Sequence, residues 1–148
     1  MTIANAMEKK PKIRFFEGLN GIKEIYNDTL RYPDQEILAW EAEEVFLYFE
    51  KEYIEWYIAK RASKKIWIRA ITPDREKIKE FKNLDSKFLR NTRLISSEKF
   101  PFDVEINLYG KSKIGIMAFS EKIGLIIESP IIYKTLKSIF EFSWENLN

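Results

Sequence analysis

A strictly alternating stretch of apolar and polar residues, FDVEINLYG, occupies positions 102–110 of the chain. Successive side chains of a strand point to opposite faces, so this pattern predicts a β-strand with one apolar and one polar side. The polar side carries Asp103, Glu105, Asn107 and Tyr109. These residues form either the solvated face of an antiparallel strand or a row of ligand-binding groups, and the alternation alone favours the solvated face.

Similar patterns predict the other elements of the chain. Short apolar runs rich in β-branched residues predict strands at 12–18, 36–42, 65–73, 92–97, 112–120 and 122–129. Apolar residues at helical spacing predict a helix that ends before Pro33, helices at 43–62 and 74–91, the latter with Asp74 as its N-cap, and a last helix beginning at Pro130. The turns YGKS and FSEK are expected to close hairpins between the last strands.

The predicted order of elements is β-α-β-α-β-α, followed by a meander and a final helix. Alternating βα units are typical of parallel strands, and successive hairpins are typical of antiparallel strands. The fold class is therefore α/β, with a mixed sheet of parallel βα units and antiparallel hairpins that is flanked by helices.

The helix expected at 43–62 begins with acidic residues and ends with basic ones, which suits the helix macrodipole. Its apolar residues occupy more than one stripe, and such a helix is buried on two sides. The second side is covered either within the domain, by the sheet and another helix, or by a second subunit. The sequence leaves these alternatives open, and it cannot rank the flanks of this helix as the dimer face.

Composition narrows the chemistry that the chain can perform. Its 148 residues include no histidine and no cysteine, so imidazole bases, thiolate nucleophiles and Cys/His metal sites are excluded. The five glycines form neither a dinucleotide-binding fingerprint nor a P-loop. We therefore expect no cofactor and no metal.

Length and charge predict one globular domain. Residues 12–148 are expected to form a single domain around one core, with 1–11 as a leader or linker remnant. The formal net charge of +2 is small for a DNA-binding surface. No apolar run approaches the roughly 20 residues that span a bilayer, and no signal peptide is evident, so we expect a cytoplasmic protein without membrane contact.

The alternating strand carries the first candidate site. Asp103 and Glu105 could form an acid–base pair or, with Asn107, hold a divalent cation, but no third carboxylate follows at a suitable spacing. Arg69 lies inside an apolar strand, where a guanidinium requires a partner. Asp103 or Glu105 could be that partner, but the sequence favours the alternative in which Arg69 reaches solvent at the end of its strand.

Other candidates lie where a parallel strand ends. Trp40 and Glu41 fall at the carboxyl end of the strand expected at 36–42, and open α/β sheets bind ligands at such ends. Trp40 is equally compatible with a purely structural place in the core. The sequence therefore predicts a polar ligand site formed by Trp40, Glu41, Arg69, Asp103, Glu105, Asn107 and Tyr109.

The ordered series of segments resembles a known family. The strings KIRFFEGLNGIKEIYNDTL, EILAW, KKIWIRAITPD, FPFDVEINLYGKSKIGIMAF and IIESPIIYKTLKSIFEFSWENL together resemble the effector domain of TrmB-like archaeal and bacterial transcriptional regulators. The resemblance covers residues 12 to 147 and implies a phospholipase D-like fold. No single string is diagnostic, and the order of the series carries the resemblance.

The same resemblance bears on catalysis. Active phospholipase D-like enzymes carry H-x-K-x-x-x-x-D on a strand that enters a hairpin turn, with the histidine as nucleophile. Aligned on the YGKS turn, this motif falls on Asp103, Glu105 and Gly110. The resemblance therefore implies a domain without the catalytic histidine motif, and we expect no enzymatic activity.

The family resemblance further implies a homodimeric effector domain that responds to a small molecule of unknown identity. Contact with DNA is expected only through a winged-helix domain that has no counterpart in these residues. No sugar-binding residue is transferred, because sugar binding in the family uses a further C-terminal subdomain. Two alternatives remain open: a divergent metal-dependent phosphodiesterase or hydrolase, and a structural dimerisation module without a ligand.

Overall fold

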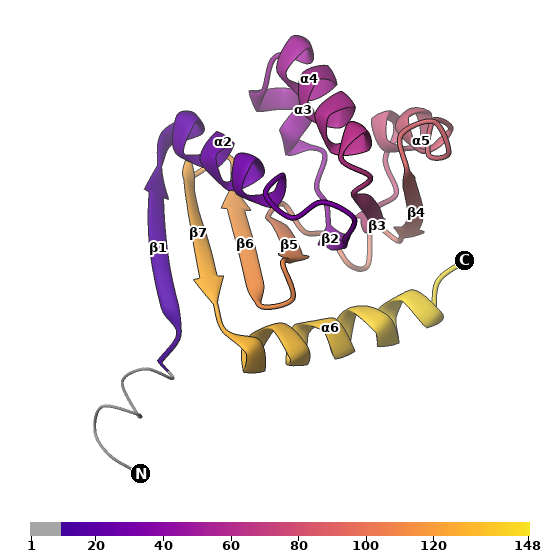
Figure 1. Ribbon diagram of the computed structural model, residues 1–148. Helices are drawn as coiled ribbons and strands as arrows, with labels where there is room; N and C mark the ends of the chain where they lie inside the picture. Colours follow the sequence, from indigo (N-terminus) through magenta and orange to yellow (C-terminus); the bar gives the residue numbers. More distant parts are fainter. Residues whose placement is uncertain (1–9) are drawn as a thin grey trace.

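The computed structural model describes residues 10–148, so the expected leader or linker remnant at 1–11 lies mostly outside the described residues. Strands and helices alternate along the first half of the chain, and hairpins follow (Figure 1). The bounds are β1 Lys12–Glu17, α2 Gly18–Thr29, β2 Glu36–Trp40, α3 Glu44–Tyr48, α4 Lys51–Ser63, β3 Trp67–Pro73, α5 Glu76–Lys82, β4 Arg90–Ile95, β5 Glu105–Tyr109, β6 Lys113–Ala118, β7 Ile123–Glu128 and α6 Pro130–Glu145.

The strands form one mixed sheet in the order β1-β7-β6-β5-β2-β3-β4. β2, β3 and β4 are parallel, and every other neighbouring pair is antiparallel. The predicted fold class is confirmed, and so are the hairpins between β5, β6 and β7. The strand expected at 92–97 was predicted as part of the meander, but β4 instead extends the parallel half of the sheet beside β3.

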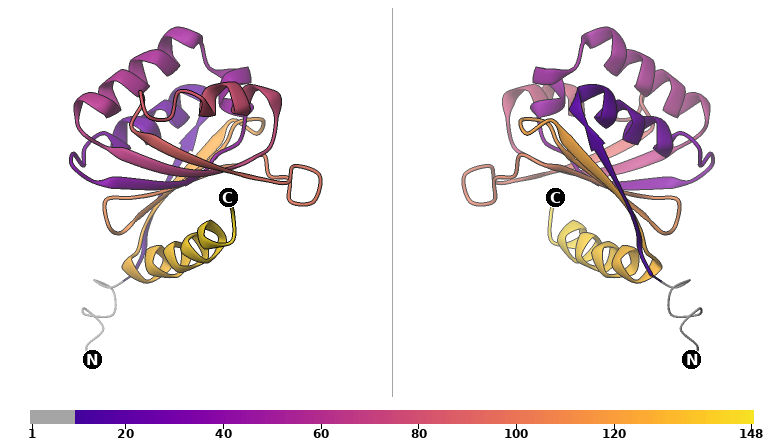
Figure 2. Two further views of the ribbon diagram at one scale, coloured as in Figure 1. Left: turned by 90° about the vertical axis from the view of Figure 1, so that its right-hand side faces the viewer. Right: turned by 90° about the vertical axis from the view of Figure 1, so that its left-hand side faces the viewer.

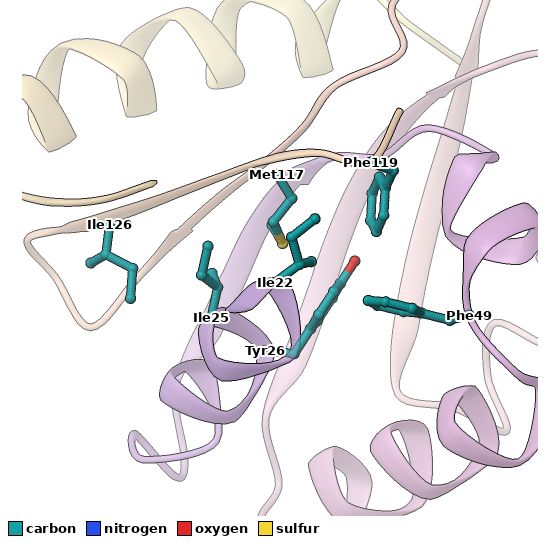
Figure 3. Packing of buried hydrophobic residues seen from close by; sticks show 7 residues of the cluster. All are labelled: Ile22, Ile25, Tyr26, Phe49, Met117, Phe119 and Ile126. Atoms are coloured by element: carbon teal, nitrogen blue, oxygen red, sulfur yellow. The ribbon is translucent and has the colours of Figure 1, made fainter. Parts of the chain in front are cut away.

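Helices cover the sheet unequally. α2, α3, α4 and α5 lie over one face, and α6 alone crosses the other face (Figures 1 and 2). Ile22, Ile25 and Tyr26 of α2 pack on the first face against Met117 and other buried residues (Figure 3). β5 lies in the middle of the sheet and is therefore covered on both sides.

The long helix expected at 43–62 is divided into α3 and α4. Phe49 and Glu50 take extended backbone angles, with ψ of 146° and 145°. The break allows Phe49 to reach the core, where it is 7% exposed and its ring contacts Tyr26 and Phe119. Burial of one aromatic ring thus outweighs the continuity of the helix.

The helix expected at 74–91 is also shorter than predicted. α5 ends at Lys82, and Arg90 already pairs with Ile68 as the first residue of β4. Asp74 is not the N-cap, because Arg75 occupies that position without a capping side-chain hydrogen bond. Asp74 instead forms an ion pair with Lys79 at 3.3 Å.

The end of α4 is fixed by a buried guanidinium. Arg61 is 1% exposed, and its Nη1 donates to the carbonyl oxygens of Ile66 at 2.7 Å and Leu89 at 3.2 Å, while Nη2 donates to that of Phe88 at 2.5 Å. These bonds satisfy backbone acceptors just before β3 and β4. Arg61 therefore joins α4 to the start of both parallel strands.

We expect Arg61→Ala to lower the free energy of unfolding by about 3 kcal/mol, because it leaves three buried carbonyl groups without their charged donor. Urea denaturation measures this change. Lys60→Ala, at the exposed neighbouring position, is the control and should change stability by less than about 0.5 kcal/mol. Equal effects of the two substitutions would contradict the role assigned to Arg61.

Candidate functional site

The polar side of β5 is buried. Glu105, Asn107 and Tyr109 are 3%, 2% and 1% exposed, because α2 and α4 cover this face of the sheet. The alternation was predicted correctly, but its interpretation as a solvated face is wrong. A row of buried polar groups requires hydrogen-bond partners, and their partners define the site.

Glu105 receives hydrogen bonds from two neutral groups. The hydroxyl of Tyr26 donates to Glu105 Oε2 at 2.9 Å, and Asn107 Nδ2 donates to the same oxygen at 3.3 Å. The hydroxyl of Tyr26 points away from α2 (Figure 3). The ring of Tyr57 meets that of Tyr26 edge-on, with centroids 5.0 Å apart. Aromatic rings of α2 and α4 therefore enclose the carboxyl group.

Burial, and after it the charge of the nearby Glu41, raise the pKa of Glu105 to about 8. Hydrogen bonds from Tyr26 and Asn107 and the charge of Arg90 lower the pKa without offsetting the burial. Glu105 is consequently protonated and neutral at pH 7. A carboxyl group in this state carries no charge and donates one hydrogen bond.

An ion pair closes the site next to Glu105. Arg90 Nη2 donates to Glu41 Oε2 at 2.8 Å, and Arg90 Nε lies 3.5 Å from Asp85 Oδ1. The guanidinium also lies 4.6 Å from the centre of the Phe81 ring. Arg90 is thus held by two carboxylates and an aromatic face at the first position of β4.

These groups line a cavity of about 60 Å³ between the sheet and the helices α3, α4 and α5. Its polar wall is formed by Glu41, Arg61, Arg90, Glu105 and Asn107, and its apolar wall includes Phe46, Ile54, Tyr57 and Phe81. Asn107 Oδ1 is buried without a hydrogen-bond partner. A cavity with an unpaired acceptor is suited to a small polar occupant.

The structure brings together three of the predicted site residues, Glu41, Glu105 and Asn107. Tyr109 lies on the same face, but its hydroxyl donates to Asp28 Oδ2 at 2.6 Å, outside the cavity. Asp103 precedes β5 and is exposed. The predicted row is therefore divided among a cavity, a separate buried ion-pair cluster and the surface.

Trp40 and Arg69 lie on the opposite face, beneath α6. The ring of Trp40 meets that of Phe140 edge-on, and Arg69 lies over the Phe140 ring. Arg69 pairs with Glu36 at 3.1 Å and with Glu141 at 2.5 Å. The pairing of Arg69 with Asp103 or Glu105 is not formed, because Arg69 and Glu105 project from opposite sides of the sheet.

Sequence reasoning missed the cavity residues Tyr26, Tyr57, Arg61 and Arg90. Tyr26 and Tyr57 stand at apolar positions of their helices, where a hydroxyl carries no distinct signal. Arg61 was explained by the basic end of the helix expected at 43–62, and Arg90 lay inside the helix expected at 74–91. A strong basic residue at the first position of a parallel strand was the one signal that could have indicated Arg90.

Within residues 10–148 no group of three or more acidic side chains is arranged to hold a metal ion. No helix of the described residues is long and apolar enough to cross a membrane.

Comparison with known proteins identifies the fold. No protein-family model and no curated protein matches the sequence. Among solved structures, the phospholipase D family member Nuc from Salmonella typhimurium superposes with a TM-score of 0.67 at 10% identity, covering 94% of this chain and 97% of Nuc. NucT from Helicobacter pylori superposes with a TM-score of 0.64 at 12% identity, covering 93% and 98%.

A third similar structure is TrmBL2, an archaeal chromatin protein, with a TM-score of 0.62 at 14% identity. The match covers 93% of this chain and 54% of TrmBL2, so the chain spans about half the length of that protein. The resemblance predicted from the sequence is confirmed at the level of the fold: the chain has the phospholipase D-like fold that is shared with TrmBL2.

The raised pKa of Glu105 predicts a pH-dependent stability. Between the pKa of the unfolded chain, 4.5, and about 8, the folded state holds a proton that the unfolded state has released. The free energy of unfolding therefore falls as pH rises through this range, by up to about 1.4 kcal/mol per pH unit. No histidine titrates in this range, because the chain has none.

Glu105→Gln should remove this slope, and urea denaturation from pH 5.5 to 8.5 measures it. The amide retains the volume of the side chain and can accept the hydrogen bond from Tyr26. Glu121→Gln, at an exposed position in the turn before β7, is the matched control and should keep the slope of the parent. An unchanged slope in Glu105→Gln would show that another group is responsible.

Proposed function

We propose that this chain is a non-catalytic effector domain that senses a signal within a TrmB-like transcriptional regulator. The observation that carries the proposal is the burial of Glu105, which stands at the lysine position of the phospholipase D-like motif in the alignment expected from the sequence. Glu105 is buried, neutral at pH 7 and lies beside tyrosine rings. This environment supports a structural rather than a catalytic role for the position.

The electrostatics of the surrounding residues support the same conclusion. Asp103 takes the position of the nucleophilic histidine, and the chain has no histidine to replace it. Burial raises the pKa of Glu44, and the neighbouring Asp103 raises it further. Under the proposal, these neighbouring carboxyl groups disfavour the approach of a phosphodiester.

The cavity supports the sensing role, because it offers space for a small ligand beside Glu105 and Asn107. Its partners under the proposal are a small effector molecule, a second copy of the chain, and DNA only through a separate domain. A regulator of this kind works in the cytoplasm.

Catalysis is tested with bis(p-nitrophenyl) phosphate in the presence of Mg²⁺, Mn²⁺ or EDTA. We expect no turnover above the blank, and no difference between the parent and Asp103→Ala. Both proteins are purified identically, so a contaminating enzyme would contribute equally to each. Turnover by the parent that is lost in Asp103→Ala would instead establish the divergent phosphodiesterase.

We place the interface of the proposed homodimer on α6. Its side away from the sheet exposes Ile131, Ile139 and Phe142 to 79%, 50% and 71%. Exposed Lys134 lies in the first half of the helix and exposed Glu145 at its end. An antiparallel arrangement of two α6 helices would therefore join apolar stripes and bring opposite charges together.

Size-exclusion chromatography with light scattering should show a dimer for the parent and a monomer for Phe142→Glu. Trp56→Glu is the control, since Trp56 is 46% exposed on α4, within the helix that the sequence indicated as a possible dimer face. This variant should remain a dimer. A monomeric parent, or dissociation by Trp56→Glu alone, would overturn the assignment to α6.

A further inference from the structure

The carboxyl group of Glu105 differs from three other buried or partly buried acidic groups that have cationic partners. Asp28 pairs with Lys113 at 2.9 Å, Glu41 pairs with Arg90 at 2.8 Å, and Asp85 lies 3.5 Å from Arg90. Among residues 10–148, no lysine or arginine nitrogen lies within 4.0 Å of the Glu105 carboxyl oxygens, and its hydrogen-bond partners are neutral. Glu105 is therefore a buried carboxyl group that lacks a cation.

A second, independent observation points to an occupant of the same cavity. Asn107 is 2% exposed, and its Oδ1 has no hydrogen-bond partner. Asn107 and Glu105 line the cavity together with the rings of Phe46, Tyr57 and Phe81. Oxygen acceptors and aromatic rings in one lining are suited to a cation, because ring faces also attract positive charge.

The arginines of the cavity do not oppose this assignment. Arg90 is held between Glu41 and Asp85, and Arg61 directs its Nη atoms at backbone carbonyl groups. The positive charges of the two arginines equal the negative charges of Glu41 and Asp85, and the neutral Glu105 adds no charge. A bound anion would leave an excess negative charge inside the protein, whereas a cation is balanced when Glu105 ionises.

We propose that the cavity binds a small monovalent cation, an ammonium ion or an alkali-metal ion of similar size, which pairs with the Glu105 carboxylate and is held by Asn107 Oδ1. The inference rests on the proposed sensing function and names the chemistry of its signal. A cavity of about 60 Å³ accommodates such an ion with a water molecule, since water in the liquid occupies about 30 Å³.

Binding of this cation is coupled to loss of a proton, because Glu105 must ionise to pair with it. The charged and titratable groups facing Glu105 come from every neighbouring element: Tyr26 of α2, Tyr57 and Arg61 of α4, Glu41 after β2, and Arg90 of β4. The affinity should therefore rise about tenfold per pH unit below the pKa of Glu105 and level off above it.

The test is thermal unfolding at pH 7.5 with NH₄Cl or KCl, in which N-methylglucamine chloride keeps the ionic strength constant. We expect a saturable rise in melting temperature for the parent, at least tenfold weaker apparent affinity in Glu105→Gln, and no change in the Glu121→Gln control. If both salts raise the melting temperature, the site selects cations by size. If the ammonium salt alone raises it, the site requires a cation that donates hydrogen bonds. No saturable rise with either salt overturns the proposal.

Isothermal titration of the parent in buffers of different ionisation enthalpy provides a readout that does not depend on the stability of a variant. Proton release on binding supports the assignment to Glu105, and binding without proton release overturns it.

The proposed sensing function and the proposed cation site fail in different experiments. Turnover of the phosphodiester would remove the sensing function and leave cation binding in place, whereas absence of binding without turnover would remove the cation alone.

Discussion

A carboxyl group that is buried between a sheet and two helices must either pair with a cation or keep its proton. Glu105 is in this position because β5 lies in the middle of the sheet, with α2 and α4 over its polar side and α6 on its apolar side. The proton on Glu105, the hydroxyl of Tyr26 and the enclosing ring of Tyr57 form one arrangement. The shape of the cavity and its charge both depend on it.

The cavity beside Glu105 lies between the sheet and the helices α3, α4 and α5, and the ion pair between Arg90 and Glu41 forms part of its polar wall near the carboxyl end of β2. The same fold occurs in phospholipase D family members and in an archaeal chromatin protein, so the fold alone does not define the chemistry of this space. The buried groups that line it do.

Much of the fold could be predicted from hydrophobic periodicity, because each strand and most helices have a distinct apolar pattern. The division of the helix at Phe49 could not be predicted, since a buried contact with Phe119 on another part of the chain causes it. The site was predicted in part. Glu41, Glu105 and Asn107 do meet, but the direction in which Arg69 points depends on which face of its strand α6 covers, and no local pattern contains that information.

The pairing of β1 with β7 has a consequence for how the protein is made. Among residues 10–148, β7 is the one strand that pairs with β1, and more than a hundred residues of chain separate Lys12 from its partner Glu128. β1 is therefore synthesised long before the strand that pairs with its backbone groups. The sheet is completed only after synthesis has passed β7, so during translation β1 is an unpaired strand that a chaperone or another nascent chain can occupy.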